Sequence, residues 1–337
     1  MHLIIPMAGQ GKRLRPYTLS TPKPLLPVAG KPIVERLIEQ IHATCPLPIQ
    51  TIGFVVSNLA PSLVNFLEQL AAGIHAQAIF FKQTEPKGTA DAVHCAKSLL
   101  RGPTMVAFAD TLFWGDLSMP TTSQSVIWVK KVQDPSAFGV VRCNAKRYVT
   151  ELVEKPEQFV SDLAIVGLYY FAQGERLAEA LETLMRKPLP AGAEYPLTDA
   201  LTDMCCQKDG AFFAQEINEW MDCGNQDAML WANERVLHAL HQRQTPLVSK
   251  TAQLHQSVLL PPVYLGEQVV IKRSVIGPYV SIGAGSHVQD VRIQHSIVQR
   301  AAHIARAQLR QAYIGDHVQL EGTTLSVRLG DYSTMRC

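Results

Sequence analysis

A glycine turn flanked by cations follows the first apolar run of the chain. The run from Leu3 to Pro6 predicts a buried strand. The turn after it contains Gly9 and Gly11, which let backbone N–H groups approach an anion closely. Lys12 and Arg13 come directly after the turn. The arrangement predicts a phosphate-binding turn at the end of a strand.

Two familiar phosphate-binding motifs fit this stretch poorly. A P-loop requires Ser or Thr after its lysine, and Arg13 follows Lys12 instead. A dinucleotide-binding fingerprint requires a third glycine, and Leu14 stands at that position. Neither motif therefore describes this turn.

The stretch resembles the signature of the sugar-1-phosphate nucleotidyltransferases, also called nucleotide-sugar pyrophosphorylases. That signature reads G-x-G-x-R-L-x-P-x-T, followed by P-K-P-L-L-P-V-x-G-K-P, with Arg13, Pro16, Thr18 and Lys23 all in place here. The resemblance implies transfer of a nucleotidyl group from a nucleoside triphosphate to a hexose-1-phosphate. An NDP-sugar and pyrophosphate are the products.

Strand patterns alternate with helical patterns from the N-terminus to Asp110. This alternation predicts an α/β fold with a doubly wound, mostly parallel sheet, and the resemblance implies a Rossmann-like sheet of the GT-A-like type. Ligands of such sheets bind beyond the carboxyl ends of the strands, where the glycine turn, Gln83 and Asp110 fall. Shorter strands follow, and a helix from Asp227 to about Gln242 closes a catalytic domain over residues 1–245.

Apolar residues recur every five or six positions in the remainder, with small or polar residues between them. The apolar positions are Leu265, Ile271, Ile276, Ile282, Val288, Ile293, Val298, Ile304, Leu309, Ile314, Leu320 and Leu325. The pattern resembles the hexapeptide repeat of left-handed parallel β-helices, each turn of which buries one residue per flat face. We expect about four coils over residues 250–337.

The resemblance also implies which residues hold the substrates. Arg13 suits the β- and γ-phosphates bidentately, and Lys23 reaches the α-phosphate, where charge builds in the transition state. The other nucleotide-binding positions are Ala8, Gly9, Gly11, Gln83, Gly88 and Thr89. The sugar phosphate is bound by Glu154 and Lys155 of an E-K-P motif, and Gly139 and Gly167 let the backbone approach the sugar.

Two aspartates are candidate ligands of Mg²⁺. Asp110 ends a predicted buried strand, and Asp222 lies in a Trp-x-Asp-x-Gly segment that matches the second acidic position of the family. Mg²⁺ accepts one or two carboxylates together with phosphate oxygens. The family usually has Asp or Asn after the first aspartate, whereas Thr111 stands here. The alternative for each aspartate is a helix cap or a turn.

The sequence indicates the identity of the nucleotide base less clearly than it indicates the phosphate-binding residues. By resemblance, the amide of Gln83 pairs with a pyrimidine edge and Gly88 leaves room for the ring. Thymidylyl-specific relatives usually have glutamine after the lysine, whereas Pro24 follows Lys23 here. We expect dTTP or UTP as the donor and leave the base open.

Two other functions fit parts of the sequence. In a bifunctional enzyme the β-helix would transfer acyl groups, which requires a histidine base beside an extruded loop. The even spacing of the repeats leaves no room for a long loop, so we interpret His287, His295, His303 and His317 as face residues. In a non-catalytic regulatory subunit the fold would only sense nucleotide sugars. The complete set of charged residues argues against the second.

Composition narrows the class further. A net charge of +2 argues against a dedicated nucleic-acid binder, and no apolar run has membrane-spanning length. Seven cysteines without framework spacing predict reduced thiols and a cytoplasmic protein. We expect a homo-oligomer assembled through the β-helix. We also expect a chain cut near Gln244 to retain transfer activity, because every residue assigned to chemistry precedes that position.

Overall fold

The computed structural model describes residues 1–119, 121, 123–205, 212–322 and 326–336. The chain divides into two compact units. The first unit comprises residues 1–9 and 35–220, and the second comprises residues 10–34 and 221–337. Most of the signature stretch therefore groups with the C-terminal repeats, and this division differs from the boundary that we expected near residue 245.

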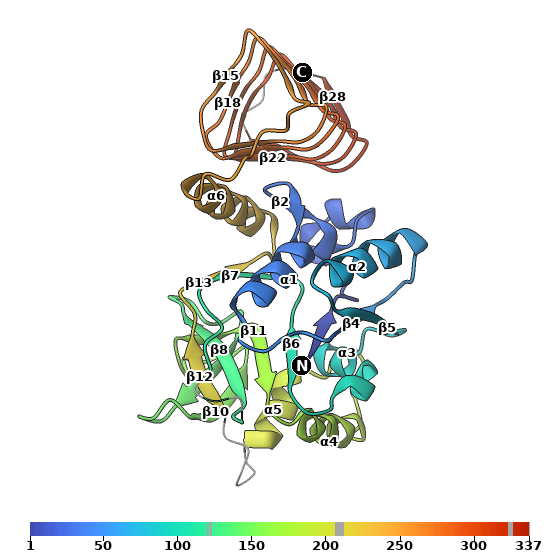
Figure 1. The fold of residues 1–337 in the computed structure, drawn as a ribbon, viewed down its shortest axis with the longest axis vertical. Coiled ribbons are helices and arrows are strands. Elements are labelled where there is room, and N and C mark those ends of the chain that lie inside the picture. The colour runs from blue at the N-terminus through green and yellow to red at the C-terminus, as the bar shows by residue number, and fades with distance from the viewer. Residues whose placement is uncertain (120, 122, 206–211, 323–325, 337) are drawn as a thin grey trace. The chain divides into compact units, whose positions relative to one another are not determined.

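A nine-stranded mixed sheet forms the centre of the first unit (Figure 1). Its path is β10-β9-β11-β6-β1-β4-β5, and β8 joins β11 and β12 beside it. The strands are β1 (His2–Pro6), β4 (Thr51–Val56), β5 (Gln77–Lys82), β6 (Thr104–Ala107), β8 (Val126–Lys131), β9 (Gly139–Cys143), β10 (Val149–Glu154), β11 (Leu163–Phe171) and β12 (Phe213–Glu216). A short strand, β7 (Thr111–Trp114), follows β6.

The parallel part of this sheet is the predicted doubly wound core. β6, β1, β4 and β5 all run parallel, so their carboxyl ends lie along one edge. β11 runs antiparallel to β6, β8 and β9 and connects the remaining strands to the core. The central strands β1, β4 and β6 are mostly apolar because they are covered on both faces, and all residues of β4 and β6 are buried. β5, at the edge of the sheet, has no fully buried residue.

Helices of the first unit form where apolar residues recur at helical spacing. They are α1 (Ile33–Thr44, which begins in the second unit), α2 (Pro61–Gly73), α3 (Thr89–Cys95), α4 (Gly174–Met185) and α5 (Leu197–Cys205). In α4, for example, Leu177, Leu181 and Leu184 share one face and are at most 3% exposed. α3, α4 and α5 pack against one another and complete the core.

The C-terminal repeats of the second unit form a left-handed parallel β-helix with three flat faces (Figure 1). One face contains β14 (Gln253–His255), β17 (Val270–Lys272), β20 (His287–Gln289), β23 (His303–Ala305), β26 (Gln319–Glu321) and β28 (Thr334–Arg336). The second contains β15 (Val258–Leu259), β18 (Val275–Ile276), β21 (Arg292–Gln294) and β24 (Gln308–Arg310). The third contains β16 (Val263–Leu265), β19 (Val280–Ile282), β22 (Ser296–Val298), β25 (Tyr313–Ile314) and β27 (Arg328–Leu329).

Strands of successive coils pair in register and stack their apolar residues. Ile271, Val288, Ile304 and Leu320 form one such column, and each is at most 1% exposed. The predicted one-residue-per-face burial is thereby confirmed; Leu325 lies outside the described residues.

Four further elements belong to the second unit or border it. α6 (Gln226–Gln242) packs on β19 and β22 of the β-helix and on β2 (Pro27–Val28). β2 pairs with β3 (Lys31–Pro32) in a small hairpin of the signature stretch. β13 (Glu219–Asp222) precedes α6. No helix in the described part of the chain is long and apolar enough to cross a membrane.

Candidate active site

Several predicted site residues follow the parallel strands of the first unit. Ala8 and Gly9 come after β1, Gln83 comes directly after β5, and Asp110 comes after β6. Because these strands are parallel, the residues share the carboxyl edge of the sheet, as predicted. A Cβ placed on Gly9 would meet no protein atom within 4 Å, so the backbone there is open to a ligand.

The side chain of Gln83 is held in one orientation. It is 7% exposed, and its Nε2 donates to Asp91 Oδ2 at 2.7 Å and to the Gly88 carbonyl at 3.2 Å. Neither a carboxylate nor a carbonyl can donate a hydrogen bond, so the NH₂ group must face both. The amide oxygen is therefore the atom that Gln83 can offer to a ligand. The sequence did not predict a role for Asp91, because no local pattern indicates its hydrogen bond with Gln83.

Gly88 is required by packing within the protein. Its φ is +112°, and a Cβ there would lie 2.4 Å from the carbonyl oxygen of Tyr195. Tyr195 also accepts from Ala90 N at 2.9 Å and donates through its own N to the Lys87 carbonyl at 2.7 Å. The hydroxyl oxygen of Thr89 accepts from Leu197 N at 2.8 Å. The loop before α3 is thus fixed by the segment before α5, a reason for glycine that the sequence did not reveal.

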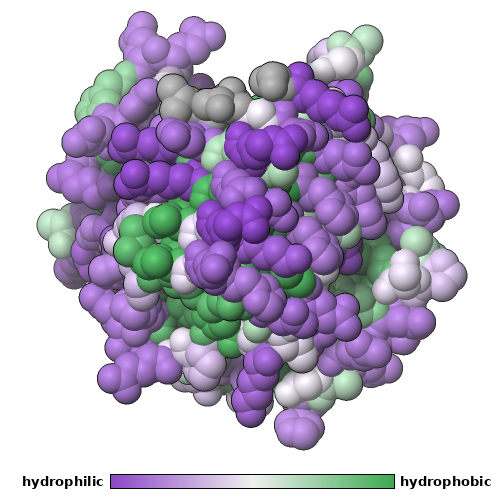
Figure 2. Space-filling view, turned by 90° about the horizontal axis from the view of Figure 1, so that it is seen from above, coloured by the Kyte–Doolittle hydropathy of each residue, from purple (hydrophilic) through white to green (hydrophobic). Residues whose placement is uncertain are grey.

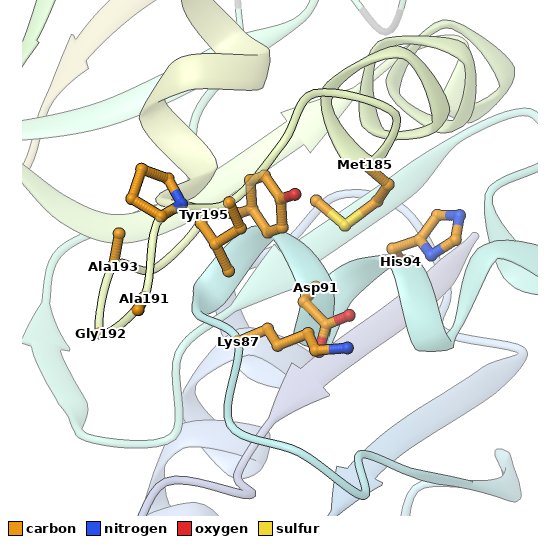
Figure 3. A pocket seen from close by; sticks show the side chains of 10 residues that line it. Lys87, Asp91, His94, Met185, Ala191, Gly192, Ala193 and Tyr195 are labelled. Carbon is orange, nitrogen blue, oxygen red and sulfur yellow. The ribbon is translucent and has the colours of Figure 1, made fainter.

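A pocket of about 610 Å³ adjoins this loop. Figure 3 shows the side chains of Lys87, Asp91, His94 and Tyr195 facing it, with Met185 contributed by α4. Asp91 consequently lies between Gln83 and an open pocket, where solvent reaches its carboxylate.

The predicted sugar-phosphate residues of β9 and β10 are neighbours. Glu154 pairs in register with Gly139, and its Oε2 accepts from the hydroxyl of Thr198 at 3.0 Å. A Cβ on Gly139 would come within 3.0 Å of that same oxygen, so glycine makes room for the carboxylate. The Nζ of Lys155 lies 3.9 Å from Glu154 Oε1, and the Lys155 side chain is 65% exposed. Lys155 is therefore accessible to an anion.

Gly167 lies against the segment that leads to Asp110. Its carbonyl accepts from Phe108 N at 2.9 Å, its φ is +82°, and a Cβ there would lie 3.0 Å from Thr111 Oγ1. Thr111, which departs from the family pattern, is 3% exposed and donates to the Val166 carbonyl at 2.8 Å. It ties the Asp110 segment to β11.

Buried Tyr169 is affected electrostatically by both Glu154 and Asp110. Its pKa is raised above the ordinary value mainly by burial, and further by the negative charges of Glu154 and Asp110. Both carboxylates therefore act on the same phenol, and the first unit brings Asp110 and the sugar-phosphate residues into one neighbourhood.

The signature stretch of the second unit is a series of short 3₁₀ helices, η1 (Lys12–Leu14), η2 (Tyr17–Leu19) and η3 (Lys23–Leu25). Gly11 has φ +58°, its carbonyl accepts from Thr18 Oγ1 at 2.8 Å, and a Cβ there would lie 3.1 Å from Lys23 Cβ. The turn therefore packs Gly11, Thr18 and Lys23 together. Arg13 is exposed, next to fully buried Leu14.

Asp222 ends β13, and the residues after it explain the spacing of its motif. A Cβ on Gly224 would come within 2.8 Å of Asp222 Oδ2, so glycine leaves space for the carboxylate. Asn225, through its Oδ1, caps α6 by accepting from Ala228 N at 2.9 Å. Asp222 is therefore not the helix cap.

Carboxylate oxygens of Asp110 and Asp222 are hard donors of the kind that Mg²⁺ prefers. In the described ranges no three His, Cys, Asp or Glu side chains gather as a metal site. Asp110 belongs to the first unit and Asp222 to the second. Mg²⁺ commonly completes its coordination with water and substrate phosphates, so each carboxylate remains a candidate ligand by its chemistry.

The histidines of the β-helix are engaged by neighbours. His287 and His303 stack with ring centroids 5.0 Å apart, and His317 stacks on Tyr332. His295 Nδ1 lies 3.0 Å from a carboxylate oxygen of Glu234. His287 and His303 lie on a face of the β-helix, as predicted. His295 and His317 lie between strands, with φ of +46° and +57°, so for these two the prediction of a face position was wrong.

The first unit is an α/β domain built on a mixed sheet with a parallel core, and the second unit contains the β-helix. The chain belongs to the nucleotidyl transferase family, whose model matches residues 3–239.

The alignments with relatives cover different fractions of the chain. Glucose-1-phosphate thymidylyltransferase of Streptomyces griseus is 27% identical over 340 residues, which covers 95% of this chain and 93% of that protein. The bifunctional protein GlmU of Methanocaldococcus jannaschii is 31% identical over 242 residues, or 72% of this chain. The match spans 55% of that GlmU and 60% of the GlmU of Methanococcus aeolicus, little more than half of each relative.

A solved UDP-glucose pyrophosphorylase, in complex with UDP-glucose, has a similar fold. It aligns with 72% of this chain and 98% of its own length, with a TM-score of 0.58 and 22% identity.

Proposed function

We propose that the protein is a Mg²⁺-dependent enzyme that transfers a nucleotidyl group from dTTP or UTP to a hexose-1-phosphate. The sugar-phosphate oxygen attacks the α-phosphorus of the triphosphate, and pyrophosphate leaves. Membership of the nucleotidyl transferase family supports the reaction class. The similarity of nearly the whole chain to a glucose-1-phosphate thymidylyltransferase supports the sugar phosphate as acceptor.

The cations and glycines have distinct roles in this proposal. Exposed Arg13 binds the β- and γ-phosphates, and Lys23, packed under the glycine turn, stabilises the charge that builds on the α-phosphate. Accessible Lys155 binds the sugar phosphate, while Glu154, oriented by Thr198, accepts from sugar hydroxyls. The open backbone of Gly9 donates to the triphosphate.

Asp110 and Asp222 would hold the magnesium ion. A bound Mg²⁺ supplies positive charge opposite the triphosphate and the leaving pyrophosphate. The two aspartates contribute oxygen ligands, and neither is used as a helix cap in the structure.

The orientation of Gln83 is the observation that carries the choice of base. With its NH₂ group held by Asp91 and Gly88, its Oε1 accepts a hydrogen bond from the base. Uracil and thymine present an N3–H donor at the centre of their pairing edge. Cytosine and adenine present an unprotonated ring nitrogen at the same point, beside an exocyclic NH₂ group, so an acceptor placed opposite the ring nitrogen disfavours them. Guanine also presents an N–H at N1, so GTP is the informative competitor.

Pyrophosphate release from five nucleoside triphosphates, each tested with several hexose-1-phosphates, tests this function. We expect release only with both substrates and Mg²⁺ present, with dTTP or UTP turned over at least tenfold faster than ATP or CTP, about the selectivity that one misplaced hydrogen bond supports. Preference for ATP would contradict the base assignment. No release with any pair would contradict transferase activity and favour a sensor.

Asp91→Asn is the matched variant for the base assignment. An asparagine amide can accept as well as donate, so it allows Gln83 to turn and present its NH₂ group. We expect the preference for dTTP or UTP over CTP to weaken in this variant while the melting temperature stays close to that of the parent. An unchanged preference would show that Asp91 does not set the orientation during catalysis.

We further propose that the protein is a cytoplasmic homo-oligomer that pairs through the β-helix with a second copy of itself. The first coil exposes Leu254, Val258 and Leu260 by 43%, 54% and 39%. Figure 2 shows apolar side chains gathered in a patch within the mostly polar surface seen from above. The seven cysteines lack the spacing of a disulfide framework, as a reducing compartment favours. Light scattering measures the molar mass of the full chain and of its Val258→Glu variant and so tests the assembly. We expect the parent to be an oligomer and the variant to lose subunits; a monomeric parent contradicts the proposal.

A further inference from the structure

The signature stretch rests directly on the last coils of the β-helix. Tyr17, between Arg13 and Lys23 in sequence, stacks on Tyr313 of β25 with ring centroids 4.0 Å apart and planes 15° apart. The Tyr17 hydroxyl donates to the Tyr313 carbonyl at 2.7 Å. Both side chains are fully buried. Burial raises the pKa of both phenols, so both hydroxyls keep their protons.

Two further contacts surround this stack. A Cβ on Gly330 would lie 2.6 Å from Pro16 Cγ, so the backbone after β27 approaches the signature stretch as closely as only glycine allows. The Ser20 hydroxyl donates to the Asp331 carboxylate, whose other oxygen accepts from Asp316 N at 2.8 Å. Asp331 thus joins the signature stretch to the β-helix backbone.

The β2-β3 hairpin makes a second attachment. Asn233 of α6, 1% exposed, accepts with one oxygen both from Ala29 N at 2.9 Å and from the Ser281 hydroxyl of β19 at 2.7 Å. Gly30 lies on the ring of Tyr264, because a Cβ there would come within 2.1 Å of Tyr264 Cζ. The signature stretch is therefore fixed to the β-helix on both sides of Lys23.

We propose that the β-helix is a positioning element for nucleotidyl transfer, with Tyr313 and Asp331 as positioning residues that hold the segment bearing Arg13 and Lys23. The proposal rests on the function proposed above for those two cations. It assigns the β-helix a part in the reaction of the same chain, in addition to assembly. Neither Tyr313 nor Asp331 needs to touch a substrate.

The structure argues against the expectation that a chain cut near Gln244 retains activity. Such a cut removes Tyr313, Tyr264 and Asp331 and exposes buried Tyr17. All residues assigned to chemistry remain, but the signature stretch loses the surface that orders it. Misplacement by about 1 Å can lower a rate about a hundredfold, so retention of the residues does not ensure activity.

Tyr313→Leu in the full chain tests the proposal, with Leu309→Ala as its matched control. Leu309 lies in the β-helix core on another face, so its truncation loosens the same domain without removing the stack. Tyr313→Phe keeps the stacked ring and the carbonyl and loses only the bond from Gln299 to the phenol oxygen. The readouts are kcat, KM for the sugar phosphate, and hydrogen exchange of the amides of residues 10–23.

We expect Tyr313→Leu to lower kcat by at least about tenfold and to speed exchange across residues 10–23, with KM for the sugar phosphate within about twofold because Lys155 belongs to the other unit. Tyr313→Phe should restore both properties, and Leu309→Ala should change neither. Equal effects of Tyr313→Leu and Leu309→Ala would overturn the proposal.

Two arrangements keep the test decisive. If Tyr313→Leu does not fold, Asp331→Ala replaces it with the same expected direction, and normal kcat with normal exchange in that variant overturns the proposal. If the parent transfers no nucleotidyl group, the proposed function fails, whereas exchange still shows whether the β-helix orders the signature stretch.

Discussion

Gly30→Ala should separate the contact with Tyr264 from ordinary backbone strain. The new Cβ would lie 2.1, 2.3 and 2.6 Å from three atoms of the Tyr264 ring, far inside normal carbon contact. Gly30 also has φ +84°, where an L-residue is strained. Strain of about 1–2 kcal/mol and overpacking of about 1–3 kcal/mol together predict a loss of about 2–5 kcal/mol in the free energy of unfolding.

Gly285→Ala is the matched control. Gly285 has φ +71° in the β-helix, but a Cβ there would meet nothing within 4 Å. Only the strain applies, so we expect a loss of about 1–2 kcal/mol. Urea titrations of both variants, followed by circular dichroism, measure the difference.

Activity gives the second half of this prediction. Because Gly30 belongs to the hairpin that follows Lys23, relief of the overlap should displace the signature stretch and lower kcat in Gly30→Ala. Gly285→Ala should keep its kcat. Equal losses of stability in the two variants, or normal kcat in a destabilised Gly30→Ala, would refute the reasoning.

Asp110→Asn and Asp222→Asn should each fold normally and lower kcat by at least about a hundredfold, because each removes a charge opposite the triphosphate; steady-state kinetics at saturating Mg²⁺ check this, and near-normal turnover would remove that residue from the metal site. Lys155→Ala should act mainly on KM for the sugar phosphate and Lys23→Ala mainly on kcat, and initial-rate kinetics showing the reverse would exchange their roles. Gly9→Ala should leave the melting temperature unchanged and raise KM for the triphosphate, since its methyl group meets only the ligand; an unchanged KM would place the triphosphate elsewhere.

Local patterns predicted most of the fold. β11, from Leu163 to Phe171, coincides with a mostly apolar run of the sequence, which is the local pattern of a buried strand. The helix expected from Asp227 to Gln242 is α6, which begins one residue earlier after its Asn225 cap. The β-helix was predictable because one buried residue per face repeats along the chain itself.

Short strands and long-range contacts were not predictable in the same way. β7 and β13 have only four residues each, too few for a periodic pattern to emerge. Asp91 and Thr198 orient Gln83 and Glu154 through contacts that exist only after folding. Tyr17 and Tyr313 are 296 positions apart, and neither carries a local signal of the other.

The same contrast between local patterns and long-range contacts applies to the candidate site. The signature predicts which residues face substrates, because the residues that would hold the phosphates lie within one segment. It did not identify what holds them in place. Gly88 illustrates the difference. The family resemblance predicts that this glycine leaves room for the base, and the structure adds that Tyr195 packs against it.

The most direct test of the account is a phosphorus NMR spectrum of the full chain incubated with Mg²⁺, dTTP or UTP, and a hexose-1-phosphate. The account predicts paired signals of a sugar diphosphate ester and equal amounts of free pyrophosphate, appearing only when both substrates are present. Release of orthophosphate without a sugar nucleotide, or an unchanged spectrum with every substrate pair, would contradict it.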